Sequence, residues 1–401
     1  MKHYLITAVL IIAFASVFSQ QHPRILFNSS EKAALQLKSN QEPFGEILHQ
    51  VRIQYNKYDL KSTPIPTNSD SVRDQAIQAA LGAFLYSVTD SIHYAQKAML
   101  LTRNCIYGKA LKSNSTTQYA DWGSSSVKGL TSYFQGTYIS LAYDMCSQAW
   151  PDTFNVSVSK KLIVMGDMIS TNGGAEQNTN TASNWQGARG AAALLCYLSS
   201  DETYSTTNFQ NSLYKMNTYL IDNLGDIFNS KGWNVESLGY MYYPMGNYVA
   251  PAIIALRLHS PTMDFRKYPS VINNYCTIFS SLTSTLDYKD IGLLHPDFGD
   301  DNPGASGEGT FGQAFYFLPD SLKQGAKFCY DKLIATNKNQ PYDNSRYGIV
   351  YSYLYYPTDV IGKNPKEISA WNDLDADCLG NGYFNFRNKY ENNEDALAQM
   401  Y

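Results

Sequence analysis

The sequence contains little charge, few histidines and no clustered cysteines. Asp, Glu, Lys and Arg make up only 16% of its 401 residues, against roughly a quarter in an average globular protein. Its 31 basic and 35 acidic residues give a net charge of -4, and no run of five basic residues occurs. Proteins that bind nucleic acid neutralise phosphates with clustered Lys and Arg. The composition therefore argues against a DNA or RNA partner.

The cysteines stand singly, with no C-x-x-C pair, as Cys105, Cys146, Cys196, Cys276, Cys329 and Cys378. This spacing excludes zinc-ribbon and thioredoxin-like sites. Three of them lie in apolar helical patterns, where a buried thiol and a disulfide both stay open. No metal-ligand spacing is present among His22, His49, His93 and His259. We therefore expect neither a metal nor a cofactor.

A long apolar run occurs only at the N-terminus, from Leu5 to Phe18. It follows a basic residue, and Val17 and Ser19 occupy the small-residue positions of a cleavage site before Gln20. At about 14 residues the run is shorter than the roughly 20 of a membrane-spanning helix. We predict a signal peptide over residues 1–19, and a protein that is secreted, or lies in the lumen of the secretory or lysosomal pathway, without membrane attachment.

Three N-x-S/T sequons, at Asn28, Asn114 and Asn155, fit a glycoprotein of that compartment. Which of them carries a glycan is not decided by the triplets, because such triplets also occur by chance.

Tyrosine is abundant, with 32 copies against 18 Phe and 5 Trp, and hydrophobic residues reach 44%. From Ser71 to about Pro357 the apolar residues recur at helical spacing, in segments separated by polar, Gly-rich or Asn-rich loops. Successive antiparallel helices form a solenoid or a closed ring, and the lack of a fixed-period repeat favours the ring. We therefore predict an (α/α) toroid over residues 20–357. Pro244 and Pro251 predict an irregular start and a kink in one helix.

About ten helices are expected from this spacing. Their predicted ranges are Ser71–Val88, Ser91–Ile106, Gly129–Cys146, Val156–Ser170, Trp185–Ser199, Phe209–Phe228, Met241–His259, Pro269–Leu282, Pro319–Ala335 and Ser345–Tyr355.

The pattern changes over residues 358–401. Gly382 to Arg387 alternate as in a strand, and a second ordered run begins near Ala396. Two strands do not form a stable sheet alone. We expect them either to pack on the toroid or to be the first strands of a β-sandwich domain that this chain contains only in part.

The segment from Asn184 to Gly190 (NWQGARG) opens an apolar helix. Ser183 or Asn184 suits the N-cap, with Gln186 as capping-box partner if Ser183 caps. Asn184, Gln186 and Arg189 also project from a helix N-terminus, where amide donors and the helix dipole favour an anion such as a carboxylate. The two interpretations are compatible.

Two further segments carry candidate groups. Gly232 to Pro244 combines glycines with a high density of aromatic rings, which suits a sugar site and equally an ordinary buried cluster. His295 to Gly304 contains three aspartates. These are possible Ca²⁺ ligands or acids, although Asp, Asn, Pro and Gly together more often build turns.

These pieces together resemble the heparinase II/III-like polysaccharide lyases and related alginate lyases. The resemblance rests on six motifs in order: His22–Phe27 (HPRILF), Gly136–Trp150 with its Ala-Tyr-Asp, Asn184–Trp185, Glu236–Tyr243, His295–Asp300 and Gly382–Asp395. Ser237 and Leu238 replace a Gly-Pro of the family. A histidine common in the family's neutraliser helix is absent, since Gln186 and Arg189 stand there, and no histidine follows His295.

The resemblance implies an (α/α) toroid followed by antiparallel β-sheet, and cleavage of an acidic, uronic-acid-containing polysaccharide of alginate or glycosaminoglycan type by β-elimination. Such a reaction needs a group that neutralises the uronate carboxylate, a base, and an acid for the leaving oxygen. Asn184, Gln186 and Arg189 suit the first role. Tyr240, or else Tyr243, suits proton transfer, with a cation nearby to lower its pKa.

Other residues have supporting roles in this hypothesis. Glu236 orients Arg189 or acts as a further acid, and His295 replaces the missing family histidine. Trp185, Trp233 and Tyr242 are the expected sugar contacts. Two alternatives remain open. One is a non-catalytic carbohydrate-binding relative, and the other is a toroid glycoside hydrolase that pairs Glu236 with one of Asp297, Asp300 and Asp301.

Overall fold

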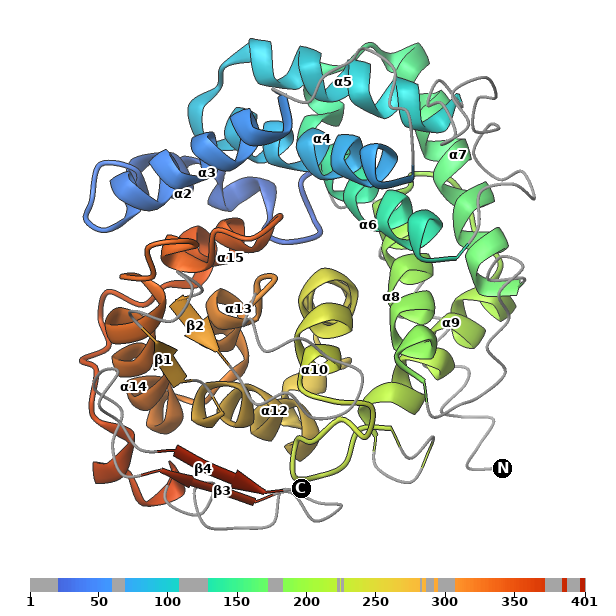
Figure 1. The fold of residues 1–401 in the computed structure, drawn as a ribbon. Helices are drawn as coiled ribbons and strands as arrows, with labels where there is room; N and C mark the ends of the chain where they lie inside the picture. Colours follow the sequence, from blue (N-terminus) through green and yellow to red (C-terminus); the bar gives the residue numbers. More distant parts are fainter. Residues whose placement is uncertain are drawn as a thin grey trace.

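A computed structural model describes residues 21–59, 69–107, 129–171, 183–221, 224, 227–281, 283–285, 292–294, 307–371, 384–387 and 397–400. Within them, the helices form two layers around a common centre (Figure 1). The inner helices are α4 (Ser69–Thr89), α6 (Gly129–Cys146), α8 (Asn184–Ser199), α10 (Gly239–Pro244) continued by η3 (Met245–Val249) and α11 (Ala250–His259), α13 (Thr310–Phe317) and α15 (Gly348–Tyr355).

The inner helices form a closed ring because each packs on the next. α4 packs on α6, α6 on α8, α8 on η3 and α11, η3 on α13, and α13 on α15. The ring closes where Phe84 of α4 meets Tyr353 of α15 edge to face, with centroids 5.4 Å apart. The predicted toroid is thus the observed arrangement of the described helices.

The outer layer consists of α3 (Phe44–Asp59), α5 (Ile92–Ile106), α7 (Asp152–Thr171), α9 (Thr206–Leu220), α12 (Pro269–Ser280) and α14 (Asp320–Cys329), the last continued by η5 (Tyr330–Ile334). The short α2 (Lys32–Lys38) precedes them. Sequence explains the two layers. All of α6 except Leu130 and Thr131 is buried, whereas α9 buries only one side, which includes Phe209 and Met216. Helices that are apolar all round occupy the interior, and amphipathic ones cover them.

Most of the predicted helices exist, with these differences. α9 ends at Leu220 and not at Phe228, since Phe228 forms a β-bridge with Asn234. α2, α3 and α13 were not among the predicted helices. The sequence of α13, TFGQAFYF, is rich in aromatic residues and contains Thr and Gly, so tertiary packing and not helix propensity supports it.

The proline-containing inner helix is irregular, as predicted. α10 ends at Pro244, the chain makes a π-helical turn over Met245–Val249, and α11 follows with Pro251 near its start. A π-turn accommodates the missing proline N–H within a continuous helix and is often found at functional sites. Asn247 lies in this turn.

The described residues form two small antiparallel sheets (Figure 1): one lies next to α13 and α14, within the outline of the ring in this view, and the other lies at the edge, beyond α12 and α14. β1 (Thr283–Thr285) pairs with β2 (Gly292–Leu294), and β3 (Phe384–Arg387) pairs with β4 (Leu397–Met400). β3 and β4 fall in the two runs where strands were predicted. The described residues do not contain the further strands of a β-sandwich, so that domain remains a prediction.

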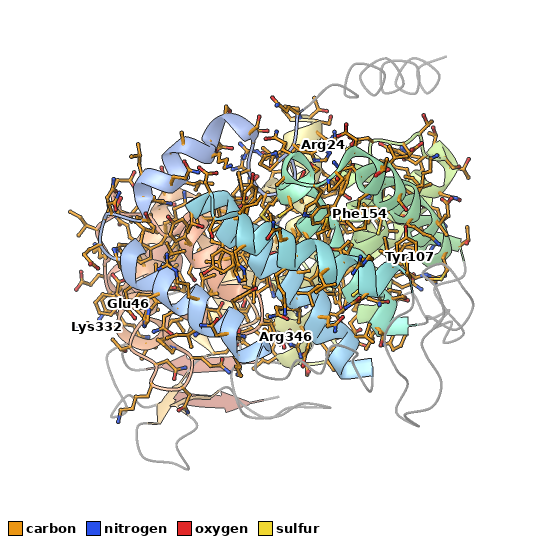
Figure 2. The ribbon with its side chains drawn as sticks, turned by 90° about the horizontal axis from the view of Figure 1, so that it is seen from above. Arg24, Glu46, Tyr107, Phe154, Lys332 and Arg346 are labelled. Carbon is orange, nitrogen blue, oxygen red and sulfur yellow. The ribbon has the colours of Figure 1, made fainter. Side chains whose placement is uncertain are left out.

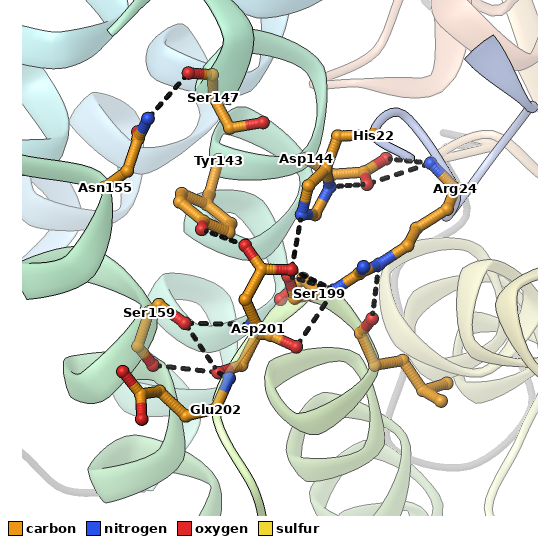
Figure 3. A network of polar contacts seen from close by, with 12 residues as sticks. His22, Arg24, Tyr143, Asp144, Ser147, Asn155, Ser159, Ser199, Asp201 and Glu202 are labelled. Carbon is orange, nitrogen blue, oxygen red and sulfur yellow. Dashed lines mark hydrogen bonds and ion pairs between the residues drawn. The ribbon is translucent and has the colours of Figure 1, made fainter. Parts of the chain in front are cut away.

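The HPRILF segment near the N-terminus is bound at the C-terminal ends of α6 and α8 (Figure 3). Asp144 of α6 accepts hydrogen bonds from the backbone N–H groups of Arg24 (2.9 Å) and Ile25 (3.0 Å), and its Oδ1 lies 2.7 Å from Nδ1 of His22. Arg24 donates to the carbonyl oxygens of Ser199 and Ser200 at the C-terminal end of α8. The segment therefore supplies donors to the Asp144 carboxylate of α6 and to the end of α8, whose last carbonyls lack partners within the helix.

Five cysteines lie in the described residues, Cys105, Cys146, Cys196, Cys276 and Cys329, and all are buried free thiols. The described helices include none that is both long enough and apolar enough to span a membrane. Residues 1–20, which contain the predicted signal peptide, and Cys378 lie outside the described residues.

Candidate functional site

A cluster of tyrosines joins α6, η3 and the segment before α13. Tyr138 of α6 donates a hydrogen bond to Oδ1 of Asn247 at 2.6 Å. Asn247 Nδ2 donates to the carbonyl oxygen of Tyr243 (2.9 Å) and to Oε2 of Glu308. The hydroxyls of Tyr243 and Tyr248 lie 3.0 Å apart. Three helical elements, α6, α10 and η3, and the segment before α13 thus bring five polar side chains into one connected network.

Ring contacts connect this network to the start of α8. Tyr133 of α6 meets Trp185 edge to face at 6.1 Å and Tyr248 at 6.5 Å, and Phe134 lies 6.0 Å from Tyr243. The two segments singled out from the sequence, around Asn184 and around Tyr243, therefore belong to the same region of the toroid. They meet at the N-terminal parts of α6 and α8, whereas the His22 network lies at the C-terminal ends. Figure 2 shows Arg24 and Arg346 on opposite sides of the molecule in that view.

An ion pair completes the cluster, which we call the tyrosine–arginine cluster (Tyr138, Tyr243, Asn247, Tyr248, Glu308, Arg346). Arg346 Nη1 lies 2.8 Å from Oε2 of Glu308. Its guanidinium also lies over the rings of Phe134 and Tyr243, at 5.3 and 5.8 Å from their centroids. A second cation, Arg73 of α4, lies 5.3 Å from the Phe134 centroid. Two guanidinium groups therefore flank one ring in a protein of net negative charge.

These charges act on the tyrosines. Burial raises the pKa of Tyr243 to about 12; the hydrogen bond with Tyr248, together with Arg346 and Arg73, opposes this rise, and Glu308 adds to it. Burial disfavours the charge of Arg346, yet Glu308 and the neighbouring tyrosines raise the pKa of its guanidinium above the ordinary value. At neutral pH Tyr243 is therefore a protonated phenol beside a permanent cation, and so a proton donor.

Ser183, one of the two predicted N-cap residues, is the N-cap of α8, and its side chain accepts a hydrogen bond from the N–H of Trp185. Oε2 of Glu236 accepts from the N–H of Asn184 at 2.8 Å, so a carboxylate of the protein occupies the anion position at this helix end. Oδ1 of Asn184, only 3% exposed, has no hydrogen-bond partner among the described residues.

Arg189 does not lie beside the tyrosine–arginine cluster as a free cation. Its Nε donates to the carbonyl oxygen of Ile169 (2.9 Å) and its Nη2 to that of Thr171 (3.3 Å), at the C-terminal end of α7. Lys215 donates to Ser170 of the same turn. Burial, together with Arg189, lowers the pKa of Lys215 to about 8. The two cations serve the end of α7, and the predicted role of Glu236 in orienting Arg189 stays a prediction.

The predicted sugar contacts differ in exposure. Trp233 and Tyr242 are 1% and 2% exposed and belong to the core, so their ring faces are not accessible to a sugar. Trp185 and Tyr240 are partly exposed. The backbone carbonyl of Tyr240 accepts from the hydroxyl of Tyr219 at 2.9 Å, which anchors the start of α10. Gln186 is buried, with 8% of its surface exposed.

His295, Asp297, Asp300 and Asp301 lie outside the described residues, so the aspartate loop and the predicted histidine substitute stay predictions. Among the described residues no group of three or more His, Cys, Asp or Glu has the arrangement of a metal site.

Three members of this region, Arg73, Glu308 and Arg346, were missed in the sequence. Arg73 lies inside α4, near its start, whereas Glu308 and Arg346 lie just before the first residues of α13 and α15. The only sequence signal is that each stands at or just before the start of an apolar inner helix. In a toroid with alternating helix directions, the inner helices all start at the same end, so charged residues at their starts converge.

Comparison with known proteins supports the fold. No family model and no curated protein matches the chain. Among solved structures, an alginate lyase from Bacteroides ovatus aligns with 82% of this chain and 99% of its own, with a TM-score of 0.51 and 11% identity. The predicted resemblance to alginate lyases is therefore supported at the level of the fold. The predicted resemblance to heparinase II/III-like lyases is supported by no family model.

Proposed function

We propose that this protein is a secreted polysaccharide lyase that cleaves a uronic-acid-containing polysaccharide by β-elimination. The observation that carries the proposal is the position of Tyr243, a protonated phenol whose ring contacts the guanidinium of Arg346 and the ring of Phe134, on which the guanidinium of Arg73 also lies. The toroid shared with an alginate lyase supports the substrate class. An acidic sugar requires groups that bind its carboxylate on a chain of net charge -4, and the guanidinium groups of Arg73 and Arg346 suit this role, although Arg346 already pairs with Glu308.

Each group has a step in the reaction. The carboxylate of the uronate withdraws charge from the developing carbanion, and the guanidinium groups of Arg346 and Arg73 suit its neutralisation. Asn184 and Gln186, predicted for this role, are only 3% and 8% exposed and are not assigned it. Tyr243 suits protonation of the leaving 4-oxygen, because its hydroxyl is protonated at neutral pH and the guanidinium of Arg346 stabilises the phenolate that remains. Tyr240, partly exposed on the same α10, is the candidate for the base.

The test is incubation of the purified protein with alginate, hyaluronan, chondroitin and heparan sulfate, followed by ultraviolet absorbance of the conjugated unsaturated uronate. We expect absorbance to grow with at least one polymer. Tyr243→Phe should lower kcat by about 10² to 10⁴-fold, the usual contribution of a positioned acid. Tyr214→Phe, a change at a 54% exposed tyrosine of α9, is the matched control and should keep full activity.

Three results would contradict the proposal. New reducing ends without absorbance indicate a glycoside hydrolase, and binding without either product indicates a carbohydrate-binding protein. An unchanged kcat in Tyr243→Phe would remove this residue from the reaction, and Tyr240→Phe, assayed in parallel, would then decide whether Tyr240 transfers the proton.

A further inference from the structure

Left-handed backbone conformations are concentrated in the two loops that carry the ion pair. Apart from Asp90, the non-glycine residues with positive φ in the described part of the chain are Glu308 (50°), Tyr342 (57°), Asp343 (61°) and Arg346 (47°). Such a conformation is unfavourable for a residue other than glycine and persists only where the surroundings hold it. Both Glu308 and Arg346 have this left-handed backbone, so other contacts must hold the backbone of the two loops in place.

The restraint consists of a carboxylate and a hydroxyl. Oδ2 of Asp343 accepts from the N–H of Gly309 at 3.0 Å, and its Oδ1 accepts from the hydroxyl of Ser345 at 2.9 Å. The same Ser345 hydroxyl accepts from the N–H of Glu308 at 2.9 Å. Asp343 and Ser345 are 2% and 5% exposed. The backbone on both sides of Glu308 is therefore tied to the loop that ends in Arg346.

Two glycines let the chain approach this feature closely. A Cβ on Gly246, in the π-turn, would lie 2.5 Å from the carbonyl oxygen of Glu308. A Cβ on Gly348 would lie 2.6 Å from the backbone nitrogen of Gly309. Glu308 is thus held between η3 on one side and the loop before α15 on the other.

We propose that Asp343 and Ser345 are positioning residues that hold the Glu308–Arg346 pair against Tyr243, an inference that rests on the proposed function. Neither residue belongs to the tyrosine–arginine cluster. Their hydrogen bonds hold the loop backbone in the conformation from which Arg346 reaches Glu308, Phe134 and Tyr243. Catalytic geometry is sensitive to such support, since misplacement by about 1 Å costs on the order of 10²-fold in rate.

The test compares Ser345→Ala, which removes the hydroxyl, with Ser345→Thr, which keeps it. We expect Ser345→Ala to lower kcat/KM by about tenfold to a hundredfold, and Ser345→Thr to restore most of it. Ser87→Ala is the matched control. It removes a 1% exposed hydroxyl that donates to a helix carbonyl near the end of α4, far along that helix from Arg73, and activity should be unchanged.

A double-mutant comparison separates positioning from general damage. If Ser345 acts through Arg346, then Ser345→Ala in an Arg346→Gln background should cause little further loss of kcat/KM, because coupled residues are not additive. Equal fold-losses in both backgrounds, or failure of Ser345→Thr to restore activity, would overturn the proposal.

Crystal structures of the wild type and of Ser345→Ala test the positioning role even if no polymer is cleaved. The expected result is that Glu308 leaves its left-handed conformation in the variant and the ion pair opens. Unchanged loops would reject the positioning role. Absence of product from the wild type alone would reject the proposed function and leave the structural comparison decisive for the loops.

Discussion

Arg189 has the charge to bind a substrate carboxylate, but its hydrogen-bond donors already stabilise the fold. Its donors serve the carbonyl oxygens of Ile169 and Thr171 at the end of α7, so we expect Arg189→Met to destabilise the fold. The expected loss in the free energy of unfolding is about 1–3 kcal/mol, because buried carbonyls lose their donors and the helix dipole loses a cation. Urea unfolding measures this loss.

The same variant tests which arginine serves the proposed reaction. With Arg346 and Arg73 beside Tyr243, Arg189→Met should change kcat/KM by less than about threefold once measured on folded protein, whereas Arg346→Met should reduce it by about 10²-fold or more. If Arg189→Met proves as inactive as Arg346→Met while remaining folded, Arg189 is a substrate-binding residue after all.

The difference between Arg189 and Arg346 also marks the limit of sequence reasoning about the site. Local spacing placed Arg189 in the first turns of α8, and that position is correct. The helix end that its guanidinium reaches belongs to α7, and no local pattern reports such a contact. Glu308 and Arg346 stand 38 residues apart in loops. Both have a left-handed backbone, a conformation that the sequence predicts for Gly, Asn or Asp but not for Glu or Arg.

At the scale of elements, the HPRILF segment depends on the charge of one histidine. Both ring nitrogens of His22 face carboxylates, Nδ1 toward Asp144 (2.7 Å) and Nε2 toward Asp201 (3.2 Å), and only an imidazolium donates from both. Burial lowers the pKa of His22, but the hydrogen bonds to Asp144 and Asp201 outweigh it and raise the pKa above 6.5.

Asp201, one of the two carboxylates that face His22, has further hydrogen-bond partners. Arg24 lies 2.9 Å from Asp201, and Tyr143 donates to the other oxygen of that carboxylate. His22 and its neighbours hold the pKa of Asp201 well below its usual range despite partial burial. Burial lowers the pKa of the nearby His259 to about 4, so this histidine stays neutral near neutral pH.

A pH dependence of stability follows from the raised pKa of His22. The contribution of the imidazolium is fully present below the unfolded-state pKa of about 6.5 and is lost as the pH rises through the higher folded-state value. The free energy of unfolding, measured in urea from about pH 6 to pH 9, should therefore fall in the wild type and fall less in His22→Gln. His49→Gln, at an exposed histidine of α3, should follow the wild type. If the free energy of unfolding changes with pH equally in the wild type and in His22→Gln, the His22 imidazolium does not stabilise the fold.

Elements were predictable where one periodicity dominates. α6 has the predicted bounds, and α8 starts one residue earlier than expected, because long apolar runs end at clear caps. α9 was predicted to end at Phe228, eight residues beyond its observed end at Leu220, because the apolar Ile227 and Phe228 continue the pattern although they lie after the helix. Short α13 was missed because its aromatic residues favour a helix only once the ring encloses them.

At the scale of the whole molecule, the ring depends on a contact between helices from opposite ends of the chain. Tyr353 of α15 packs edge to face on Phe84 of α4 and on Phe44 of α3, and its hydroxyl donates to the carbonyl of Leu35 at 2.7 Å. Aromatic pairs of this geometry contribute about 0.5–1.5 kcal/mol beyond the area they bury. One side chain thus joins α2, α3 and α4 to the last inner helix.

Opening this contact should loosen both ends of the ring together. We expect Tyr353→Leu to lower the free energy of unfolding by roughly 2–4 kcal/mol, through the lost ring volume and the unpaired Leu35 carbonyl. Hydrogen exchange should show protection falling in α4 as well as in α15, since each loses its neighbour. Tyr214→Leu, on the outside of α9, should leave both helices as protected as in the wild type. Loss of protection confined to α15 would mean that α4 is held by α3, α5 and α6 alone, and that the ring does not depend on its closure.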